Sequence, residues 1–182
     1  MQDVGCFYLL DADAFHCLRS LDAFRRFSDS DVRIRLVLTE YVARHELSVL
    51  VADVDRLVSL GFLEVKPVSS RDEDYRRLQK EVDKGEAEAI AWALKQARSD
   101  RPFFISNDKK ALKTAINNRI AGGDVFDMMI HLMDANALSE ETAREILAVW
   151  EDKRQQRGRP ADFTTFQSSV AQRRAKRRLH AT

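Results

Sequence analysis

The feature that most constrains the fold is a regular alternation between short apolar runs and longer amphipathic stretches. Four runs have the length and composition of buried strands, and segments with apolar residues at helical spacing lie between them. Strands that alternate with helices favour a parallel sheet covered by helices on both faces. We therefore predict a three-layer α/β/α sandwich around a central parallel sheet. The predicted strands cover residues 6–10, 34–38, 62–65 and 103–106.

Two predicted helix starts matter for the site. Thr39 is expected to cap a helix whose apolar face carries Val42, Ala43 and Leu47, because its hydroxyl can accept a hydrogen bond from a free backbone N–H. Gly85 is expected to open another helix. Further helices are predicted over residues 71–83, 108–120, 124–136, 140–150 and 166–179.

Charge is distributed unevenly along the 182 residues. Residues 151–182 contain nine basic and three acidic residues, a net charge of +6, whereas residues 1–150 carry a net charge of −5. This asymmetry predicts a domain over residues 1–138 and a helical extension over residues 139–182 with a basic tail. The tail contains the run QRRAKRR, which is suited to phosphate contacts.

Several classes of protein are excluded by the composition. The two cysteines, Cys6 and Cys17, have no metal-binding spacing, so we expect a reducing cytoplasm and no disulfide framework. No signal peptide is visible, and no apolar run approaches the ~20 residues that span a membrane. The four histidines are scattered, which disfavours zinc. There is no Gly-rich phosphate loop, and nothing supports a Ser/His/Asp triad.

Acidic residues follow two of the predicted strands. Asp11 ends the first, and the run Ser106, Asn107, Asp108 ends the fourth. Ligands of open parallel sheets bind outside the carboxyl ends of the strands, so both acids are expected at one edge. Either aspartate alone is equally well explained as a helix N-cap.

Two predicted helices add glutamates to this set. Glu86 falls on the apolar face of its helix, whereas Glu88 is expected nearer the solvent. Glu46 lies on the apolar side of the preceding helix, and Glu40 is the alternative there. Four converging acids would repel one another unless a cation joined them, and oxygen ligands suit Mg²⁺ or Mn²⁺.

The segments YLLDADAF, TEYVARHEL, GEAEAIAWAL and FISND, in this order, resemble those of PIN-domain nucleases over about residues 7–138. The resemblance implies an α/β/α sandwich whose acidic pocket holds one or two metal ions and hydrolyses phosphodiester bonds of RNA. Many members of the family are toxins of bacterial toxin–antitoxin pairs, so a cognate antitoxin and a homodimer are expected partners.

Matching the segments residue by residue gives each acid an expected role. The catalytic set is Asp11, Glu46 (or Glu40), Glu86 (or Glu88) and Asp108. Ser106 and Thr39 are expected to hold ligands or a phosphate oxygen through hydrogen bonds. Asp124 is expected either as an outer metal ligand or as an ordinary helix N-cap. The expected metal ligands are Asp11, Asp108, Glu86, Glu88 and Asp124, and the tail residues expected to bind RNA are Arg173, Arg174, Lys176 and Arg177.

Two other interpretations remain open at the level of sequence. The pair Asp11 and Asp13 also fits a haloacid-dehalogenase-like phosphatase, with Asp11 as nucleophile and Asp13 as general acid. The basic tail also fits a module that binds nucleic acid or a partner protein without catalysis. If the tail does not bind nucleic acid, it is expected to be a solvated helix, a flexible end, or a surface that docks on the body of the protein or on a partner.

Overall fold

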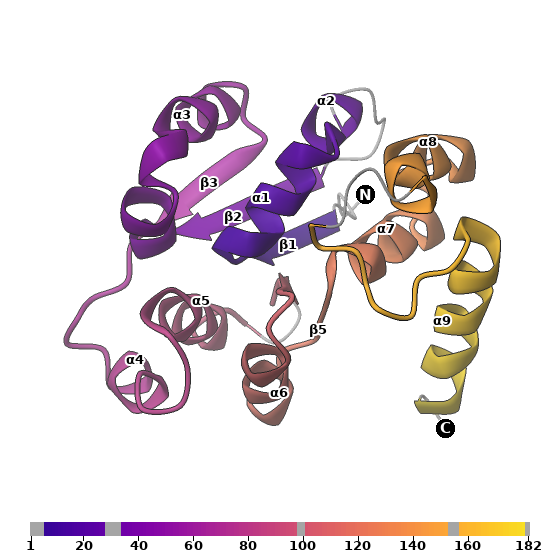
Figure 1. The fold of residues 1–182 in the computed structure, drawn as a ribbon. Coiled ribbons are helices and arrows are strands. Elements are labelled where there is room, and N and C mark those ends of the chain that lie inside the picture. Colours follow the sequence, from indigo (N-terminus) through magenta and orange to yellow (C-terminus); the bar gives the residue numbers. More distant parts are fainter. Residues whose placement is uncertain (1–5, 28–33, 98–100, 153–156, 181–182) are drawn as a thin grey trace.

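The structure is a computed structural model, and it describes residues 6–27, 34–97, 101–152 and 157–180. The side chains of residues 6 and 178–180 lie outside the described part, and with them the tail residue Arg178. The predicted three-layer α/β/α sandwich is confirmed (Figure 1). All strand pairs are parallel, in the order β3-β2-β1-β4-β5. The strands are β1 (Cys6–Leu10), β2 (Ile34–Thr39), β3 (Leu63–Lys66), β4 (Phe103–Ile105) and β5 (Gly122–Gly123).

Helices cover both faces of the sheet because the side chains of each strand alternate between them. From β1, Tyr8 and Leu10 point into one core and Leu9 into the other. The first core is closed by α1 (Ala12–Ser20), α2 (Ala23–Phe27), η1 (Val42–Glu46), α3 (Val51–Ser59), α7 (Val125–Asp134) and α8 (Glu140–Glu151). The second core is closed by α4 (Glu73–Leu78), α5 (Lys84–Leu94) and α6 (Lys109–Asn117).

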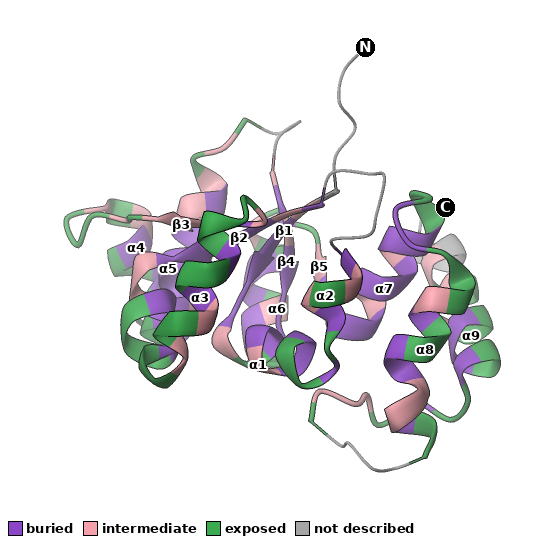
Figure 2. Ribbon diagram, turned by 90° about the horizontal axis from the view of Figure 1, so that it is seen from above, coloured by how far each residue is buried: buried purple, intermediate pink, exposed green. Residues whose placement is uncertain are grey.

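The C-terminal extension shares the first core and wraps one end of it (Figures 1 and 2). Phe163 lies edge-on to Phe126 of α7 and to Trp150 of α8, with ring centroids 5.2 and 5.4 Å apart. The last helix, α9 (Phe166–His180), buries Phe166 and Val170 against the same cluster. The predicted boundary at residue 138 therefore falls inside one continuous core.

Three local predictions were wrong. Thr39 is the last residue of β2 and not an N-cap. The chain then continues through η1 and η2 (Ser48–Leu50) before α3 begins. The segment η1 is a π-helix, because the Leu47 N–H bonds to Val42 O at 2.9 Å, five residues back. The helix predicted over residues 71–83 is shorter, since Asp72 caps α4 by accepting the Tyr75 N–H at 2.9 Å. The short strand β5 was not predicted, because two glycines carry no apolar signature.

Candidate active site

Two neighbouring strands bring the first predicted residues together. Leu10 of β1 pairs with Ile105 of β4, so Asp11 and Ser106 leave the sheet side by side at its carboxyl edge. The Asp11 N–H extends the ladder by donating to Ile105 O at 3.1 Å. Thr39 of β2 flanks Asp11 on the other side, two residues after the pair between Leu9 and Val37.

Asp11 is a buried carboxylate with a structural task. Its side chain is 6% exposed, caps α1 by accepting the Ala14 N–H at 2.6 Å, and is hydrogen-bonded to the Ser106 side chain. Burial, together with the negative charges of Asp13 and Glu46, raises its pKa to about 6. Asp11 therefore carries a charge at neutral pH that the apo fold does not fully compensate.

Asp108 and Glu86 are the next two acids of the predicted set. Asp108 is exposed and caps α6 by accepting the N–H groups of Lys110 and Ala111 at 2.6 and 2.9 Å. Glu86 accepts the Asp83 N–H at 3.2 Å with Oε2, at the start of α5. Burial, together with the negative charges of Asp108 and Asp11, raises the pKa of Glu86 to about 7. These carboxylates thus form one electrostatic unit.

Glu46 is the glutamate of η1 that faces α5. A Cβ atom on Gly85 would collide with its carboxylate, which accepts a hydrogen bond from the Gly85 backbone. Burial raises the pKa of Glu46, and Asp83 and Glu88 reinforce the shift. The alternative, Glu40, is paired with Arg44 at 2.9 Å.

The expectation that Glu88 lies nearer the solvent was wrong. Glu88 is only 6% exposed, and its Oε2 accepts the Tyr41 N–H at 2.8 Å. The helix α5 is buried on nearly all sides, so helical spacing could not identify an outer face. Glu88 thus accepts a free backbone N–H at the start of the segment after β2. Thr39 was expected to fill this capping role.

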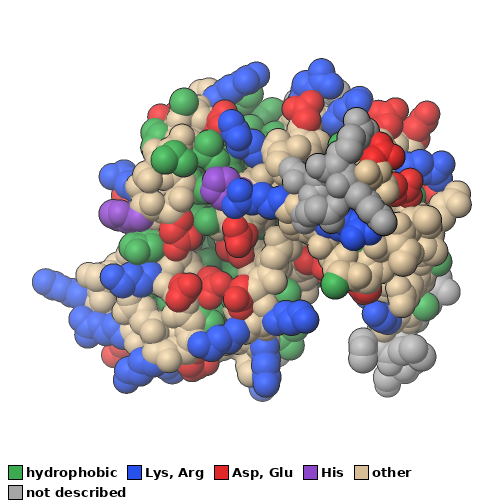
Figure 3. Space-filling model, in the orientation of Figure 1, with side chains coloured by type: hydrophobic (Ala, Val, Ile, Leu, Met, Phe, Trp, Pro, Cys, Tyr) green, Lys and Arg blue, Asp and Glu red, His purple; other side chains and the backbone are tan. Residues whose placement is uncertain are grey.

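The donor set fits a hard, water-retaining cation. Figure 3 shows acidic side chains gathered in front of the strand ends, with basic side chains around them. The buried Thr39 Oγ1 has no hydrogen-bond partner within the described residues, which leaves a hydroxyl available to a ligand or to its water shell. Across the same residues, no three Asp, Glu, His or Cys side chains enclose a cation-sized space directly. Mg²⁺ usually keeps several waters and needs only one or two carboxylates, and oxygen ligands such as these suit it better than zinc.

Comparison with known families decides the relationship. Residues 14–161 match DUF3368, described as a PIN domain. The chain belongs to the PIN domain family. Proteins of this family are generally nucleases and usually bind divalent metals. The match begins three residues after Asp11 and runs to residue 161, beyond the predicted boundary at residue 138.

Two further comparisons complete the description of this PIN domain protein. A solved PilT N-terminus domain protein, SSO1118 from the archaeon Sulfolobus solfataricus P2, is similar with 14% identity and a TM-score of 0.46, covering 73% of this chain and 94% of that one. No curated protein matches the sequence. In the described residues, no helix is long and apolar enough to cross a membrane.

Asp124 lies at the edge of this site in a different environment. It caps α7 by accepting the Asp127 N–H at 2.9 Å, and Asp127 accepts the Asp124 N–H in return at 3.2 Å. Arg173 of α9 binds both carboxylates, at 3.0 Å from Asp124 Oδ2 and 2.8 Å from Asp127 Oδ2, and also reaches Asp162 at 2.8 Å. Asp124 is thus an N-cap whose carboxylate is paired with the Arg173 guanidinium. Its expected role as an outer metal ligand stays a prediction.

The other tail residues also pair within the chain. Arg174 binds Asp134 at 2.6 Å, Lys176 contacts Asp162 at 3.5 Å, and Arg177 contacts Asp127 at 3.4 Å. Their expected binding to RNA stays a prediction that must compete with these ion pairs. At the level of sequence, only the opposite net charges of tail and body pointed to these partners.

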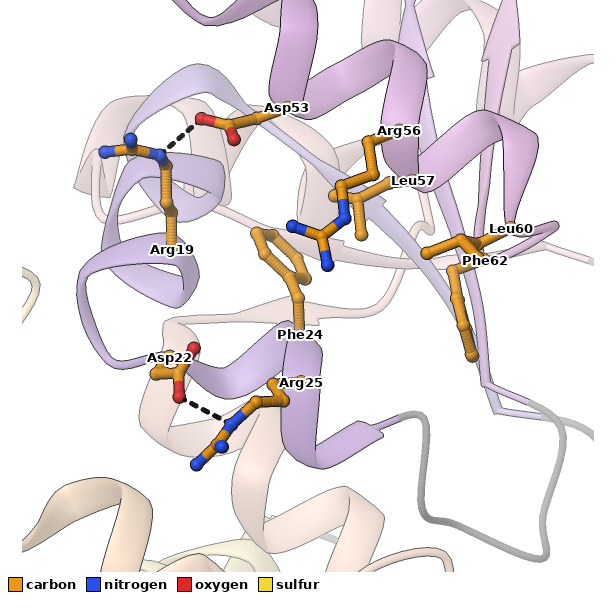
Figure 4. A pocket seen from close by; sticks show the side chains of 9 residues that line it. All are labelled: Arg19, Asp22, Phe24, Arg25, Asp53, Arg56, Leu57, Leu60 and Phe62. Carbon is orange, nitrogen blue, oxygen red and sulfur yellow. Dashed lines mark hydrogen bonds and ion pairs between the residues drawn. The ribbon is translucent and has the colours of Figure 1, made fainter.

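A hollow at the opposite edge of the sheet lacks a comparable set of acidic side chains (Figure 4). It has a volume of about 270 Å³ and lies between α1, α2 and α3, near Phe62 at the start of β3. Arg19 pairs there with Asp53 at 2.6 Å, and Arg25 with Asp22 at 2.9 Å. Its polar groups are largely satisfied, so the carboxylate edge is the better candidate for chemistry.

Proposed function

We propose that this protein is a Mg²⁺- or Mn²⁺-dependent endoribonuclease. The observation that carries the proposal is the set of acids Asp11, Glu86 and Asp108 at the carboxyl edge, where burial and the charges of nearby carboxylates raise the pKa values of Asp11 and Glu86. Carboxylates whose ionised form is disfavoured in the metal-free protein are the groups that a bound cation would stabilise. Family membership favours this activity over the phosphatase interpretation.

The carboxylates of Asp11 and Asp108 would be the principal ligands, with Glu86 and Glu46 completing the cage directly or through water. When bound, the cation supplies an activated water and neutralises charge that develops on the phosphate. Ser106 orients Asp11 through their hydrogen bond, as supporting residues commonly orient ligands. Glu86 keeps Oε1 available, because Oε2 accepts the N–H of Asp83.

The proposed setting follows the family resemblance. RNA is the proposed substrate, and a cognate antitoxin and a second copy of the chain are the proposed partners. The free thiol of the buried Cys17 is compatible with a reducing cytoplasm. Expression in a bacterial host should slow growth, and an Asp11→Asn variant should not.

The decisive experiment is cleavage of labelled single-stranded and hairpin RNA by the purified protein. Cleavage should require Mn²⁺ or Mg²⁺, stop on addition of EDTA, and fail with Asp11→Asn. A DNA strand of the same sequence tests the preference for RNA. Metal-independent cleavage, or metal binding without any cleavage of RNA, would refute the proposal; the second result would support a binding module.

A further inference from the structure

A second hollow opens beside the carboxylate edge. It has a volume of about 660 Å³ and is lined by Ser106 and Asn107, at the end of β4, and by Lys109 at the start of α6. It is also lined by the segment 157–162, which precedes α9. Because Ser106 leaves the sheet beside Asp11, this hollow borders the proposed catalytic site.

The wall from the extension is fixed by packing and hydrogen bonds. Gly158 has φ +70° and sits so close to Cys17 of α1 that a Cβ atom would collide with Sγ. Arg159 donates to Trp150 O at 3.1 Å and to Phe163 O at 2.7 Å. A wall held in this way is formed before any ligand arrives, which reduces the entropy cost of binding.

The hollow is lined by both acidic and basic side chains, and two of the basic ones are placed to contact an anion. Three of its acids, Asp124, Asp127 and Asp162, are held by the Arg173 guanidinium, which offsets part of their negative potential. Arg157, on the extension side, contacts Asp13 at 3.2 Å. Both side chains of this pair are highly exposed (48% and 69%), so the contact is weak enough to exchange for a phosphate.

Lys109, at the start of α6, also lines the hollow. Its ammonium makes no hydrogen bond or ion pair with any residue in the described ranges. Lys109 and Arg157 are therefore two cations beside a site whose own carboxylates repel a polyanion. A substrate strand needs such cations next to the acidic centre.

We propose that this hollow binds the nucleotide next to the scissile phosphate of a single-stranded RNA, with Lys109 and Arg157 contacting its phosphates. The inference rests on the proposed ribonuclease function and adds a substrate-binding wall supplied by the C-terminal extension. Ser106 and Asn107 supply hydrogen-bonding groups to the sugar or base. The extension is then part of the substrate site.

The test measures binding apart from cleavage. Asp11→Asn protein is titrated into a fluorescein-labelled eight-nucleotide RNA, and anisotropy gives Kd at several salt concentrations. Adding Lys109→Gln or Arg157→Gln should raise Kd about tenfold, as loss of a charge-assisted contact does. Each change should also reduce the salt slope by about 0.7. Arg157→Lys keeps the charge and should retain the slope.

Matched controls remove an equal charge outside the hollow. Lys110→Gln alters the neighbouring residue of α6, and Arg71→Gln alters an exposed arginine before α4. Neither control should change Kd more than about twofold. If Lys109→Gln and Arg157→Gln bind RNA like these controls, the inference is overturned, whether or not the wild-type protein cleaves RNA. If both weaken binding but the wild type cleaves nothing, the hollow stands as an RNA site and the ribonuclease proposal fails.

Discussion

Asp11 serves at once as a helix cap and as a buried charge. Its carboxylate accepts the Ala14 N–H, and burial raises its pKa to about 6. Asn caps helices about as well as Asp but carries no charge. We expect Asp11→Asn to reduce RNA cleavage by at least about a hundredfold, with a Tm that is unchanged or higher. Cleavage assays and thermal melts of the same preparation measure both.

Asp11→Ala is the natural comparison, because it also removes the cap. It should lower the free energy of unfolding by about 1 kcal/mol relative to Asp11→Asn. A folded Asp11→Asn protein that cleaves RNA at the wild-type rate would contradict the assigned role.

Raised pKa values predict how stability depends on pH. Asp11 and Glu86 move from ordinary values of 3.8 and 4.5 to about 6 and about 7 in the folded protein. The folded state then binds more protons than the unfolded state between about pH 4 and 7. Without divalent cations, the contribution of these groups to stability is largest below pH 4 and is lost as pH rises through 7. Thermal melts from pH 4 to 8 should show this loss.

Two additions make the pH experiment specific. In the Asp11→Asn/Glu86→Gln double variant the fall between pH 4 and 7 should become smaller. Mg²⁺ should raise Tm more at pH 8 than at pH 5, since the ionised carboxylates bind it. An equal Tm increase at both pH values would argue against these two groups as ligands.

At the scale of elements, α9 is attached to α7 through one largely buried arginine. Arg173 and its partners Asp124 and Asp127 each expose only 17% of their side chains. Removing one partner of a buried ion pair leaves charges uncompensated, so Arg173→Gln should lower the free energy of unfolding by about 3 kcal/mol. Urea denaturation measures this loss.

Arg174 supplies a control from the same helix. Its pair with Asp134 is more exposed, at 37% and 41%, and Arg174→Gln should cost less than about 1 kcal/mol. Equal losses for the two variants would show that Arg173 has no special part in holding α9.

At the scale of the whole molecule, the extension completes the hydrophobic core. Phe163, Phe166 and Val170 are buried with Trp150 in the core that covers one face of the sheet. Burial of an apolar side chain contributes roughly 1.5–3 kcal/mol, so deleting residues 162–182 should cost on the order of 5 kcal/mol. Circular dichroism melts and dye binding to exposed apolar surface test this. A truncated protein with the wild-type Tm would show that the core closes without α9.

Much of the fold was visible in the sequence because it depends on local signals. Apolar runs gave four strands, and parallel pairing placed Asp11 and Ser106 at one edge. What escaped prediction depends on tertiary contacts. Two of the three partners of Arg173 lie 46 and 49 residues away, so only their opposite charges were apparent. Glu88 was misplaced because its helix is apolar on nearly every side.

The close contact between Gly158 and Cys17 offers a way to measure how the C-terminal extension moves. The Cys17 thiol is buried, so reagents cannot reach it in the folded protein. Burial also raises its pKa to about 12, so the reactive thiolate is scarce. A thiol reagent can reach Sγ only after the segment 157–162 lifts from α1. In a Cys6→Ser background, the labelling rate of Cys17 therefore reports how often the extension opens. Bound RNA that spans Lys109 and Arg157 should slow that labelling.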